Sequence, residues 1–340
     1  MLPAFADSPS LGAGGMTELS LVTGGAGFIG SHLVEALLHA GHAVRVFDDF
    51  STGLRQNLRH LARFGNALDV VEGSITDPTA TAKALRDVGV VYHLAALASV
   101  ARSVENPAAT HAACVTGTLN LLDAARKVGV RRVVYAASSS AYGGATQPGG
   151  QREDQLPAAK SPYAAAKLAG ELYMQAFAAT YGLETVRLRF FNIFGPRQRS
   201  DSPYSGVIAL FAAVMARGDL PTVHGDGLQS RDFTYVTNAV QALRRAAEVP
   251  DVSGNVYNVG TGRSVTVRDL VAALNDVLET DLEPTYGAPR AGDVKFSRAD
   301  IHRTMTDLGY APKVTFEDGL RQTVAWYLET SGAFRTLSRV

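Results

Sequence analysis

Two residues four positions apart, Tyr163 and Lys167, have the side chains of a proton-transfer pair. They lie in SPYAAAKLAG (161–170), a run of alanines and other helix formers that begins with Ser-Pro. Positions i and i+4 share one face of a helix, so the ammonium would lie beside the phenol and favour the phenolate. The pair could therefore act as a tuned acid and base. An ordinary aromatic–cation contact on a surface helix is the alternative.

A glycine-rich segment, TGGAGFIG (23–30), places Gly24, Gly27 and Gly30 between an apolar run and a helical pattern. In that context the glycines allow a tight turn and close approach of a pyrophosphate, which a helix N-terminus stabilises. Asp48 ends the next apolar run, where a carboxylate accepts hydrogen bonds from the adenosine ribose and repels a 2′-phosphate. The pattern predicts a dinucleotide site that prefers NAD to NADP. A plain turn with a capping aspartate is the alternative.

Three consecutive serines, Ser138 to Ser140, follow the apolar run at 131–137. In a doubly wound sheet the carboxyl ends of the strands face the ligand crevice. Hydroxyl groups at that edge can hydrogen-bond a substrate oxygen. A serine cluster alone usually marks a turn, but this one lies at the predicted end of the fifth strand and precedes Tyr163 and Lys167.

Short apolar runs alternate with helical patterns throughout the first half of the chain. Buried strands that alternate with helices form βαβ units, so the pattern predicts an α/β fold with a doubly wound, mostly parallel sheet. The expected strands are 18–23, 43–48, 69–73, 90–95, 131–138 and 184–190, and the expected helices are 28–40, 78–88, 106–127 and 161–181.

The regular alternation ends near residue 192, where glycine, proline and arginine become frequent. We expect a flexible N-terminal extension at 1–16, a Rossmann domain at 17–191 to which a later segment returns, and a smaller mixed α/β substrate lobe at 192–330. Helical patterns in this lobe cover 205–217, 236–248 and 266–279, with short strands between them.

The 340 residues carry 32 basic and 32 acidic side chains, so the formal net charge is zero. Without a basic block, nucleic acid and anionic membranes are poor partners, and no apolar run reaches the length of a membrane span. The single cysteine, Cys114, excludes an internal disulfide framework and favours a reducing, cytoplasmic location. His93 and His111 lack the spacing of metal ligands, so no metal is expected.

Taken together, these motifs resemble those of extended short-chain dehydrogenases/reductases that act on nucleotide sugars, and most of all UDP-hexose 4-epimerases of the UDP-glucose or UDP-N-acetylglucosamine type. The resemblance implies NAD-dependent 4-epimerisation of a UDP-hexose through a transient 4-keto sugar, with NAD kept bound. It also implies a homodimer formed by helices 106–127 and 161–181. It spans roughly residues 17–328 and rests on TGGAGFIG, HLAA (93–96), SSSAYG (138–143), YAAAK (163–167), RFFNIFGPRQ (189–198), SRDFTYV (230–236) and AGDVKFSRAD (291–300).

The resemblance also implies roles for individual residues. Tyr163 would be the base that removes the sugar 4-hydroxyl proton. Lys167 would hold the nicotinamide ribose and lower the pKa of Tyr163, and Ser138 would bridge the 4-oxygen and Tyr163. The implied cofactor contacts are Gly24, Gly27, Phe28, Ile29, Gly30, Asp48, Asp49, Ser51, Thr52, Gly53, Ser74, Ile75, Leu94, Ala95, Ala96 and Phe191. The implied substrate contacts are Ser139, Ser140, Asn192, Gly206, Val207, Thr222, His224, Arg231, Arg290, Asp293 and Ser297.

Three positions bear on how closely the family pattern is followed. Ser74 stands where the family usually has an aspartate near the adenine, and Cys114 stands in the place of a frequent asparagine. The resemblance implies that Ser297 occupies a gate position beside the C2 substituent of the sugar. A small residue there leaves room for an N-acetyl group, whereas a large ring would be overpacked against it. We therefore expect the N-acetylated sugars to be accepted along with the plain ones.

The alternative enzyme activities require different side chains at the positions that follow Ser138. Dehydratases of this family carry Asp-Glu there and decarboxylases carry a glutamate, whereas Ser139 and Ser140 cannot do that acid–base work at neutral pH. A UDP-glucuronate 4-epimerase stays open, because related enzymes can share a serine-rich loop. An NAD-binding scaffold or regulator without turnover would not need Ser138, Tyr163 and Lys167 together.

Overall fold

The computed structural model describes residues 18–145, 149–201, 205–289 and 294–331. Within these ranges, seven strands form one sheet whose pairings are all parallel. They are β1 (Leu19–Thr23), β2 (Val44–Asp48), β3 (Leu68–Glu72), β4 (Val88–His93), β5 (Arg132–Ser138), β6 (Glu184–Phe190) and β11 (Val256–Val259). Their order across the sheet is β11-β6-β5-β4-β1-β2-β3. This confirms the doubly wound α/β fold that the alternating pattern predicts.

Helices cover both faces of this sheet, because successive strand residues point to opposite sides. Val22, Val90 and Val134 share an apolar cluster mainly with two helices, whereas Leu21 and Val91 face a cluster with three others. Burying one such side chain stabilises the folded state by roughly 1.5–3 kcal/mol. Packing on both faces therefore stabilises the sheet and fixes the position of its carboxyl edge. The first two helices are α1 (Phe28–His39) and α9 (Val236–Glu248); the other three are α3 (Pro78–Ala84), α6 (Gly117–Val128) and α7 (Pro162–Tyr181).

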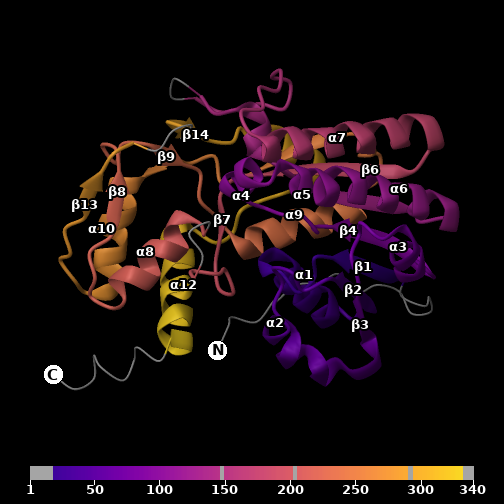
Figure 1. The fold of residues 1–340 in the computed structure, drawn as a ribbon, viewed down its shortest axis with the longest axis horizontal. Helices are drawn as coiled ribbons and strands as arrows, with labels where there is room; N and C mark the ends of the chain where they lie inside the picture. The colour runs from indigo at the N-terminus through magenta and orange to yellow at the C-terminus, as the bar shows by residue number, and fades with distance from the viewer. Residues whose placement is uncertain (1–17, 146–148, 202–204, 290–293, 332–340) are drawn as a thin grey trace.

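The C-terminal elements form a second apolar core of their own. Phe194, Phe211, Leu270 and Leu320 are buried together in it. In Figure 1 most of these elements lie on the opposite side of the molecule from the main sheet. They include the helices α8 (Val207–Met215), α10 (Val267–Leu278) and α12 (Phe316–Ser331). The short strands are β7 (Ile193–Phe194), β8 (Thr222–His224), β9 (Ser230–Arg231), β10 (Thr234–Tyr235), β12 (Val265–Thr266), β13 (Thr285–Gly287) and β14 (Phe296–Ser297).

These short strands pair as β10-β7, β12-β9-β14 and β13-β8. The pairing is mixed, because β12 runs antiparallel to β9 whereas β14 runs parallel to it. Three elements from this half of the sequence belong to the main sheet and its helices: β11 pairs with β6, α9 packs against α1, and α11 (His302–Leu308) packs against β11 and α9. The domain boundaries, 17–191 and 192–330, stay a prediction, and the extension at 1–16 lies outside the described residues.

The expected helix over 106–127 is divided into three pieces. Asn106 caps the first piece by accepting a hydrogen bond from the Ala109 N–H over 3.0 Å, and a π-helical turn at Ala112–Thr116 interrupts the chain between α5 (Pro107–His111) and α6. The sequence analysis also missed α2 (Gln56–Arg59), the 3-10 segment His60–Ala67, α4 (Val100–Glu105) and α11. Each is too short to show a clear helical period.

In the described parts of the chain, no helix has the length and apolar character needed to cross a membrane.

Candidate active site

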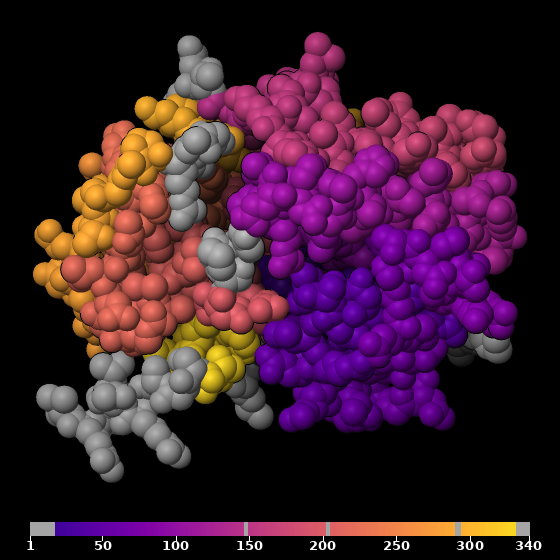
Figure 2. Space-filling model, in the orientation of Figure 1, coloured from indigo at the N-terminus to yellow at the C-terminus, as the bar shows by residue number. Residues whose placement is uncertain are grey.

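A cavity of about 850 Å³ follows the carboxyl edge of the main sheet. Its wall takes residues that end or follow β1, β2, β4, β5 and β6, together with Arg231 and Ser297 from the C-terminal strands. The surface in Figure 2 shows the indigo-to-magenta sheet half beside the salmon-to-orange C-terminal half. Both halves contribute to this wall, and in a doubly wound sheet ligands bind at this edge.

The glycine loop forms a tight cradle between β1 and α1. Gly24 has φ +68°, and a Cβ built there would lie 2.8 Å from the Ala95 nitrogen. A Cβ on Gly30 would lie 2.1 Å from the Gly24 carbonyl oxygen, so no side chain fits there. The first N–H groups of α1 have no partners within the helix, and they can therefore bind an anion. The cradle fits the pyrophosphate of NAD.

Asp48 ends β2 inside the same cavity. Its carboxylate accepts hydrogen bonds from the backbone N–H groups of Ala26 and Phe50, each over 2.9 Å. A Cβ on Gly53 would lie 2.8 Å from Asp48 Oδ1, so this glycine leaves one side of the carboxylate open. Burial raises the pKa of Asp48, and the two backbone bonds oppose that rise. Each oxygen has a second lone pair, which fits ribose hydroxyls.

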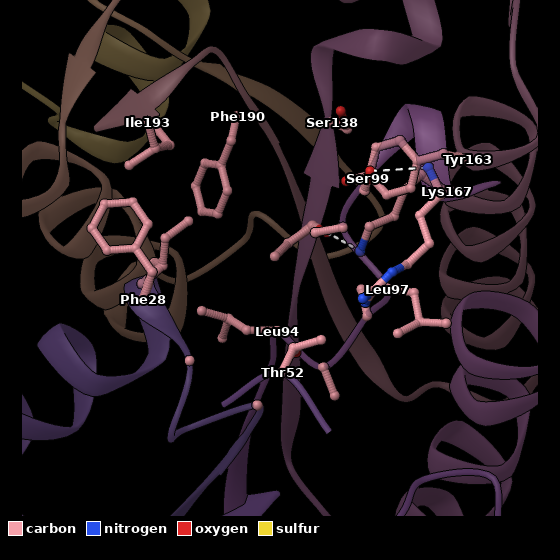
Figure 3. A pocket seen from close by; sticks show the side chains of 18 of the residues that line it. Phe28, Thr52, Leu94, Leu97, Ser99, Ser138, Tyr163, Lys167, Phe190 and Ile193 are labelled. Atoms are coloured by element: carbon pink, nitrogen blue, oxygen red, sulfur yellow. Dashed lines mark hydrogen bonds between the residues drawn. The ribbon is translucent and has the colours of Figure 1, made fainter. Parts of the chain in front are cut away.

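Helix α7 carries the predicted acid–base pair. Ser161 caps its N-terminus by accepting a hydrogen bond from the Ala164 N–H over 3.1 Å, and Pro162 is its first residue. Figure 3 shows Tyr163 and Lys167 close together near Ser138, with Phe190 across the cavity. The structure thus brings the three predicted catalytic side chains to one end of the cavity.

The environment of this pair differs from the expectation in one respect. Burial raises the pKa of the Tyr163 phenol, and its contact with Ser138 opposes part of that rise. Burial lowers the pKa of the Lys167 ammonium. The expected lowering of the Tyr163 pKa by Lys167 is not seen, because Lys167 Nζ donates to the Ala136 carbonyl over 2.8 Å and lies 4.6 Å from the centre of the Tyr135 ring.

The serine loop follows β5 as a short 3-10 turn. Ser138 Oγ accepts hydrogen bonds from the Ser140 N–H over 3.2 Å and from the Ser140 hydroxyl over 2.9 Å. Since its lone pairs are engaged, the Ser138 hydroxyl is oriented to donate its own proton. All three serines line the cavity. No carboxylate stands at these positions to protonate a leaving group.

Short strands place the predicted substrate residues. Arg231 on β9 pairs in register with Ser297 on β14, so the two residues are neighbours, and both line the cavity. Asp232 fixes this arrangement: its buried carboxylate accepts hydrogen bonds from the Thr261 N–H over 2.8 Å and from the Ala299 N–H over 3.1 Å. Burial raises the pKa of Asp232, and these bonds oppose the rise.

Most predicted site residues line this cavity. Those at the cofactor end are Gly24, Gly27, Phe28, Ile29, Gly30, Asp48, Asp49, Ser51, Thr52, Gly53, Ser74, Ile75, Leu94, Ala95 and Ala96. Those toward the substrate end are Ser138, Ser139, Ser140, Tyr163, Lys167, Asn192, Gly206, Arg231 and Ser297.

Four predicted residues lie elsewhere. Phe190, not Phe191, lines the cavity: Phe191 is fully buried against Tyr142 and Ala299, because neighbouring side chains of an extended chain point to opposite sides. Val207 and Thr222 do not line the cavity either.

His224 lines a second cavity, of about 580 Å³, together with Gly225, Gly287, Pro289 and other residues. Val294 lines both cavities, so the two adjoin. Arg290 and Asp293 lie outside the described residues.

The two departures from the family pattern are differently placed. Ser74 lines the cavity, and its hydroxyl lies 3.0 Å from the Thr76 hydroxyl. Cys114 is fully buried in the π-helical turn, which packs against α7. In the parts of the chain that the structure describes, no cluster of His, Cys, Asp or Glu side chains could hold a metal ion.

Several cavity residues were not predicted as site residues. Arg197, Gln198 and Arg199 follow β7 and line the wall, as do Ser99 and Arg102 from the segment after β4. The first two belong to the motif RFFNIFGPRQ, so their place in the sequence was visible. Their role was not, because it depends on contacts with residues more than 100 positions away.

The sheet order, the glycine cradle and the Tyr-Lys helix define a dinucleotide-binding α/β chain of Rossmann type. Residues 20–260 match the model of the NAD dependent epimerase/dehydratase family. The chain therefore belongs to this family, and NAD is its cofactor.

Several 4-epimerases of UDP-sugars are similar to this chain over nearly its whole length. A UDP-glucose 4-epimerase of Mycolicibacterium smegmatis is 38% identical over 92% of this chain and 99% of its own length. The crystal structure of a UDP-glucose 4-epimerase of Thermotoga maritima with UDP-glucose has a TM-score of 0.87 at 39% identity, covering 92% of this chain and 99% of that one. A UDP-N-acetylglucosamine 4-epimerase of Methanobrevibacter ruminantium has the same TM-score, 0.87, and the same coverage at 38% identity.

Other relatives carry different activities. A UDP-N-acetyl-alpha-D-glucosaminuronate decarboxylase of Bacillus cytotoxicus is 33% identical over 92% of this chain and 99% of its own length. UDP-glucuronate 4-epimerase 4 of Arabidopsis thaliana is 32% identical over 91% of this chain and 75% of its own length.

Proposed function

We propose that this protein is an NAD-dependent 4-epimerase of UDP-hexoses, interconverting UDP-glucose with UDP-galactose and the two corresponding N-acetylated sugars. The observation that carries the proposal is the position of Ser138, Tyr163 and Lys167 in one cavity with the glycine cradle. The named activities of the relatives that share 38–39% identity support it.

The chain supplies the proton chemistry at the sugar 4-oxygen. NAD, when bound between the glycine cradle and Asp48, supplies a reversible acceptor for the hydrogen at C4. The Ser138 hydroxyl holds the 4-oxygen, and Tyr163 takes the 4-hydroxyl proton and returns it to either epimer. Tyr163 has to be a phenolate to accept this proton and is a neutral phenol afterwards. Lys167, whose buried ammonium donates to the Ala136 carbonyl, keeps its predicted role of holding the nicotinamide ribose.

The nucleotide part of the substrate is assigned to the C-terminal wall. Arg231 and Asn192 line the cavity where a diphosphate would cross it, and a guanidinium suits that group well. The adjoining cavity beside His224 is assigned to the base. Arg290 and Asp293 keep their predicted roles as diphosphate and ribose contacts.

Substrate breadth follows from Ser297. This residue is small, 7% exposed and next to Arg231. A serine there leaves room for an N-acetyl group at C2, so both plain and acetylated sugars should turn over.

The test is NMR of product mixtures from UDP-glucose, UDP-N-acetylglucosamine and UDP-glucuronic acid, with wild type and Ser297→Tyr. Wild type should epimerise the first two, and the variant should lose the acetylated sugar far more than the plain one. The assignment of Ser297 as a gate would be contradicted if wild type does not epimerise UDP-N-acetylglucosamine. It would also be contradicted if Ser297→Tyr loses activity equally toward both sugars.

A second candidate function is UDP-glucuronate 4-epimerisation. It is favoured by the Arabidopsis relative and by the serine-rich loop at the carboxyl end of β5, where Ser138, Ser139 and Ser140 line the cavity. Turnover of UDP-glucuronic acid without turnover of either hexose would select it. If the protein binds NAD but turns over none of the three sugars, the result would favour an NAD-binding scaffold or regulator without turnover.

We also propose a homodimer, through a face that carries α7, which covers the expected helix 161–181, and α4 in place of the helix expected at 106–127. These helices pack against each other and expose Val100, Val104, Leu172 and Tyr173, which is an unusual number of apolar side chains for two neighbouring helices. Light scattering should give twice the chain mass for wild type and the chain mass for Leu172→Arg. A monomeric wild type contradicts this surface. The cytoplasmic location stays a prediction.

A further inference from the structure

A cluster of polar side chains joins the loop after β7 to the first two turns of α1. His32 Nε2 donates to the Pro196 carbonyl over 2.9 Å. Arg197 forms an ion pair with Glu35, and its Nη1 lies 3.5 Å from the Ser31 hydroxyl. The cluster has no part in the proton chemistry, and it links the beginning of the C-terminal elements to the helix that carries the glycine cradle.

The ion pair of this cluster is well shielded. The side chains of Arg197 and Glu35 are 13% and 18% exposed. His60 Nε2 lies 3.2 Å from Arg197 Nη2 and 3.2 Å from Glu35 Oε1, so the His60 ring contacts both partners of the ion pair. Burial raises the pKa of Glu35, but Arg197 outweighs that effect and holds the pKa below its usual range. Removing either partner leaves an unpaired charge in a poorly hydrated place.

The same loop is part of the cavity wall. Arg197 and Gln198 line the cavity beside Phe28, the first residue of α1. The Phe28 ring packs edge-on against His32, with ring centres 5.9 Å apart. Arg197 has φ +67°, which is unfavourable for a residue with a side chain, so the loop depends on its contacts to keep this shape. From the other side, Gln198 accepts a hydrogen bond from Tyr327 on α12.

We propose that Arg197 is a positioning residue that clasps this loop onto α1 through Glu35 and thereby retains NAD in the cavity. The inference rests on the proposed function, in which NAD stays bound through many turnovers. A dinucleotide held at the start of α1 leaves past the wall that the loop forms. Breaking the clasp frees the loop and opens that path, while Ser138, Tyr163 and Lys167 stay in place.

The experiment measures how fast NAD leaves the purified holoenzyme. Wild type, Arg197→Gln, Arg197→Lys, Glu35→Gln and the double variant Glu35→Gln/Arg197→Gln are mixed with isotopically labelled NAD, and exchange is followed by mass spectrometry. The control is Arg217→Gln, which removes an exposed ion pair with Asp219 in the same half of the molecule, with exposures of 57% and 62%. Turnover is measured with and without excess NAD.

We expect exchange about tenfold faster or more in Arg197→Gln and in Glu35→Gln, because breaking a shielded charge pair acts mainly on dissociation. The double variant should be no faster than the faster single variant, since both break one contact. Arg197→Lys should lie between wild type and Arg197→Gln, and the control should match wild type. Excess NAD should restore kcat in every clasp variant, which a general loss of structure would not allow.

Exchange within twofold of wild type in both single variants would overturn the clasp. So would fast exchange in Arg197→Gln with wild-type exchange in Glu35→Gln, because Arg197 would then act on NAD directly. If Arg197→Gln does not fold, Glu35→Gln and Arg197→Lys decide the question. A wild type that is purified without NAD contradicts the retained cofactor of the proposed function, and that result is distinct from an unchanged exchange rate.

Discussion

The glycine cradle at the cofactor end of the cavity rests on backbone packing, whereas the substrate end around Arg231 rests on side-chain hydrogen bonds. At the cofactor end, Gly24 and Gly30 pack against backbone atoms next to strands of the seven-stranded sheet. At the substrate end, two-residue strands are held by Asp232, whose carboxylate accepts hydrogen bonds from Thr261, Gly262 and Ala299.

This difference shows which changes each end tolerates. A backbone cradle fails when a side chain is added, because the atoms it would meet cannot move without the sheet. A side-chain support fails when a single carboxylate is lost, because several N–H groups then lose their acceptor together. Damage at one end should leave the other intact, and the four changes below test that separation.

The largest effect is expected where the two ends meet, at Tyr163. Tyr163→Phe removes the acid–base group without changing the shape of the wall, so turnover should fall roughly 10²–10⁴-fold. NAD content and UDP-sugar binding, measured by mass spectrometry and calorimetry, should stay close to wild type. Tyr181→Phe, at the exposed end of the same helix, is the matched control. Unchanged turnover in Tyr163→Phe would remove this residue from the mechanism.

The next largest effect should come from Gly30→Ala at the cofactor end. The new Cβ meets the Gly24 carbonyl oxygen at 2.1 Å, so the loop must move, and overpacking of this kind costs roughly 1–3 kcal/mol. We expect the purified variant to contain little NAD. Gly149→Ala, where no atom lies within 4 Å of the added carbon, should contain as much as wild type. A variant Gly30→Ala that keeps its full NAD content would contradict the backbone cradle.

At the substrate end, Asp232→Asn is the corresponding change. The amide keeps the size of the carboxylate but offers one acceptor oxygen in place of two, and an unsatisfied buried group costs roughly 1–3 kcal/mol. The KM for the UDP-sugar should rise several-fold, while the NAD content stays at the wild-type level. Asp219→Asn, on an exposed side chain, is the control. Loss of NAD from Asp232→Asn would show that the two ends are not separate.

The smallest effect concerns the contact between the two halves at His32. Burial, and then Arg197, lower the pKa of His32 to about 4. The unfolded chain binds this proton below about pH 6.5, so between these values it carries more protons than the folded chain, and stability falls as the pH falls. Urea unfolding of wild type should give a lower free energy of unfolding at pH 5 than at pH 7, and the difference should be smaller in His32→Gln. An equal difference in wild type and His32→Gln would show that His32 does not cause the pH dependence.

The cofactor end of the cavity can be predicted from the sequence more fully than the substrate end, for physical reasons. Strands such as Leu19–Thr23 and the cradle at Gly24 are readable because they arise from neighbouring residues: an apolar run, a glycine turn, then a helix. Asp232 was not read as a support, because its partners Thr261 and Ala299 lie 29 and 67 positions away.

Two further residues show the same limit of sequence-based prediction. Phe191 was chosen in place of Phe190 because the motif fixes the segment but not the side to which each ring points. Arg197 lies within a recognised motif, yet its partner Glu35 lies 162 positions earlier in the chain. Residues whose role depends on a distant partner carry no local signal.

The most direct test of the central claim follows the hydrogen at C4 of the sugar. Wild-type protein is incubated in ordinary water with UDP-glucose that carries deuterium at C4, and the product is read by NMR. If Ser138, Tyr163 and Lys167 move only the hydroxyl proton while NAD holds the C4 hydrogen, UDP-galactose forms with its deuterium retained at C4. Product with hydrogen from the solvent at C4, or no UDP-galactose at all, would contradict the account.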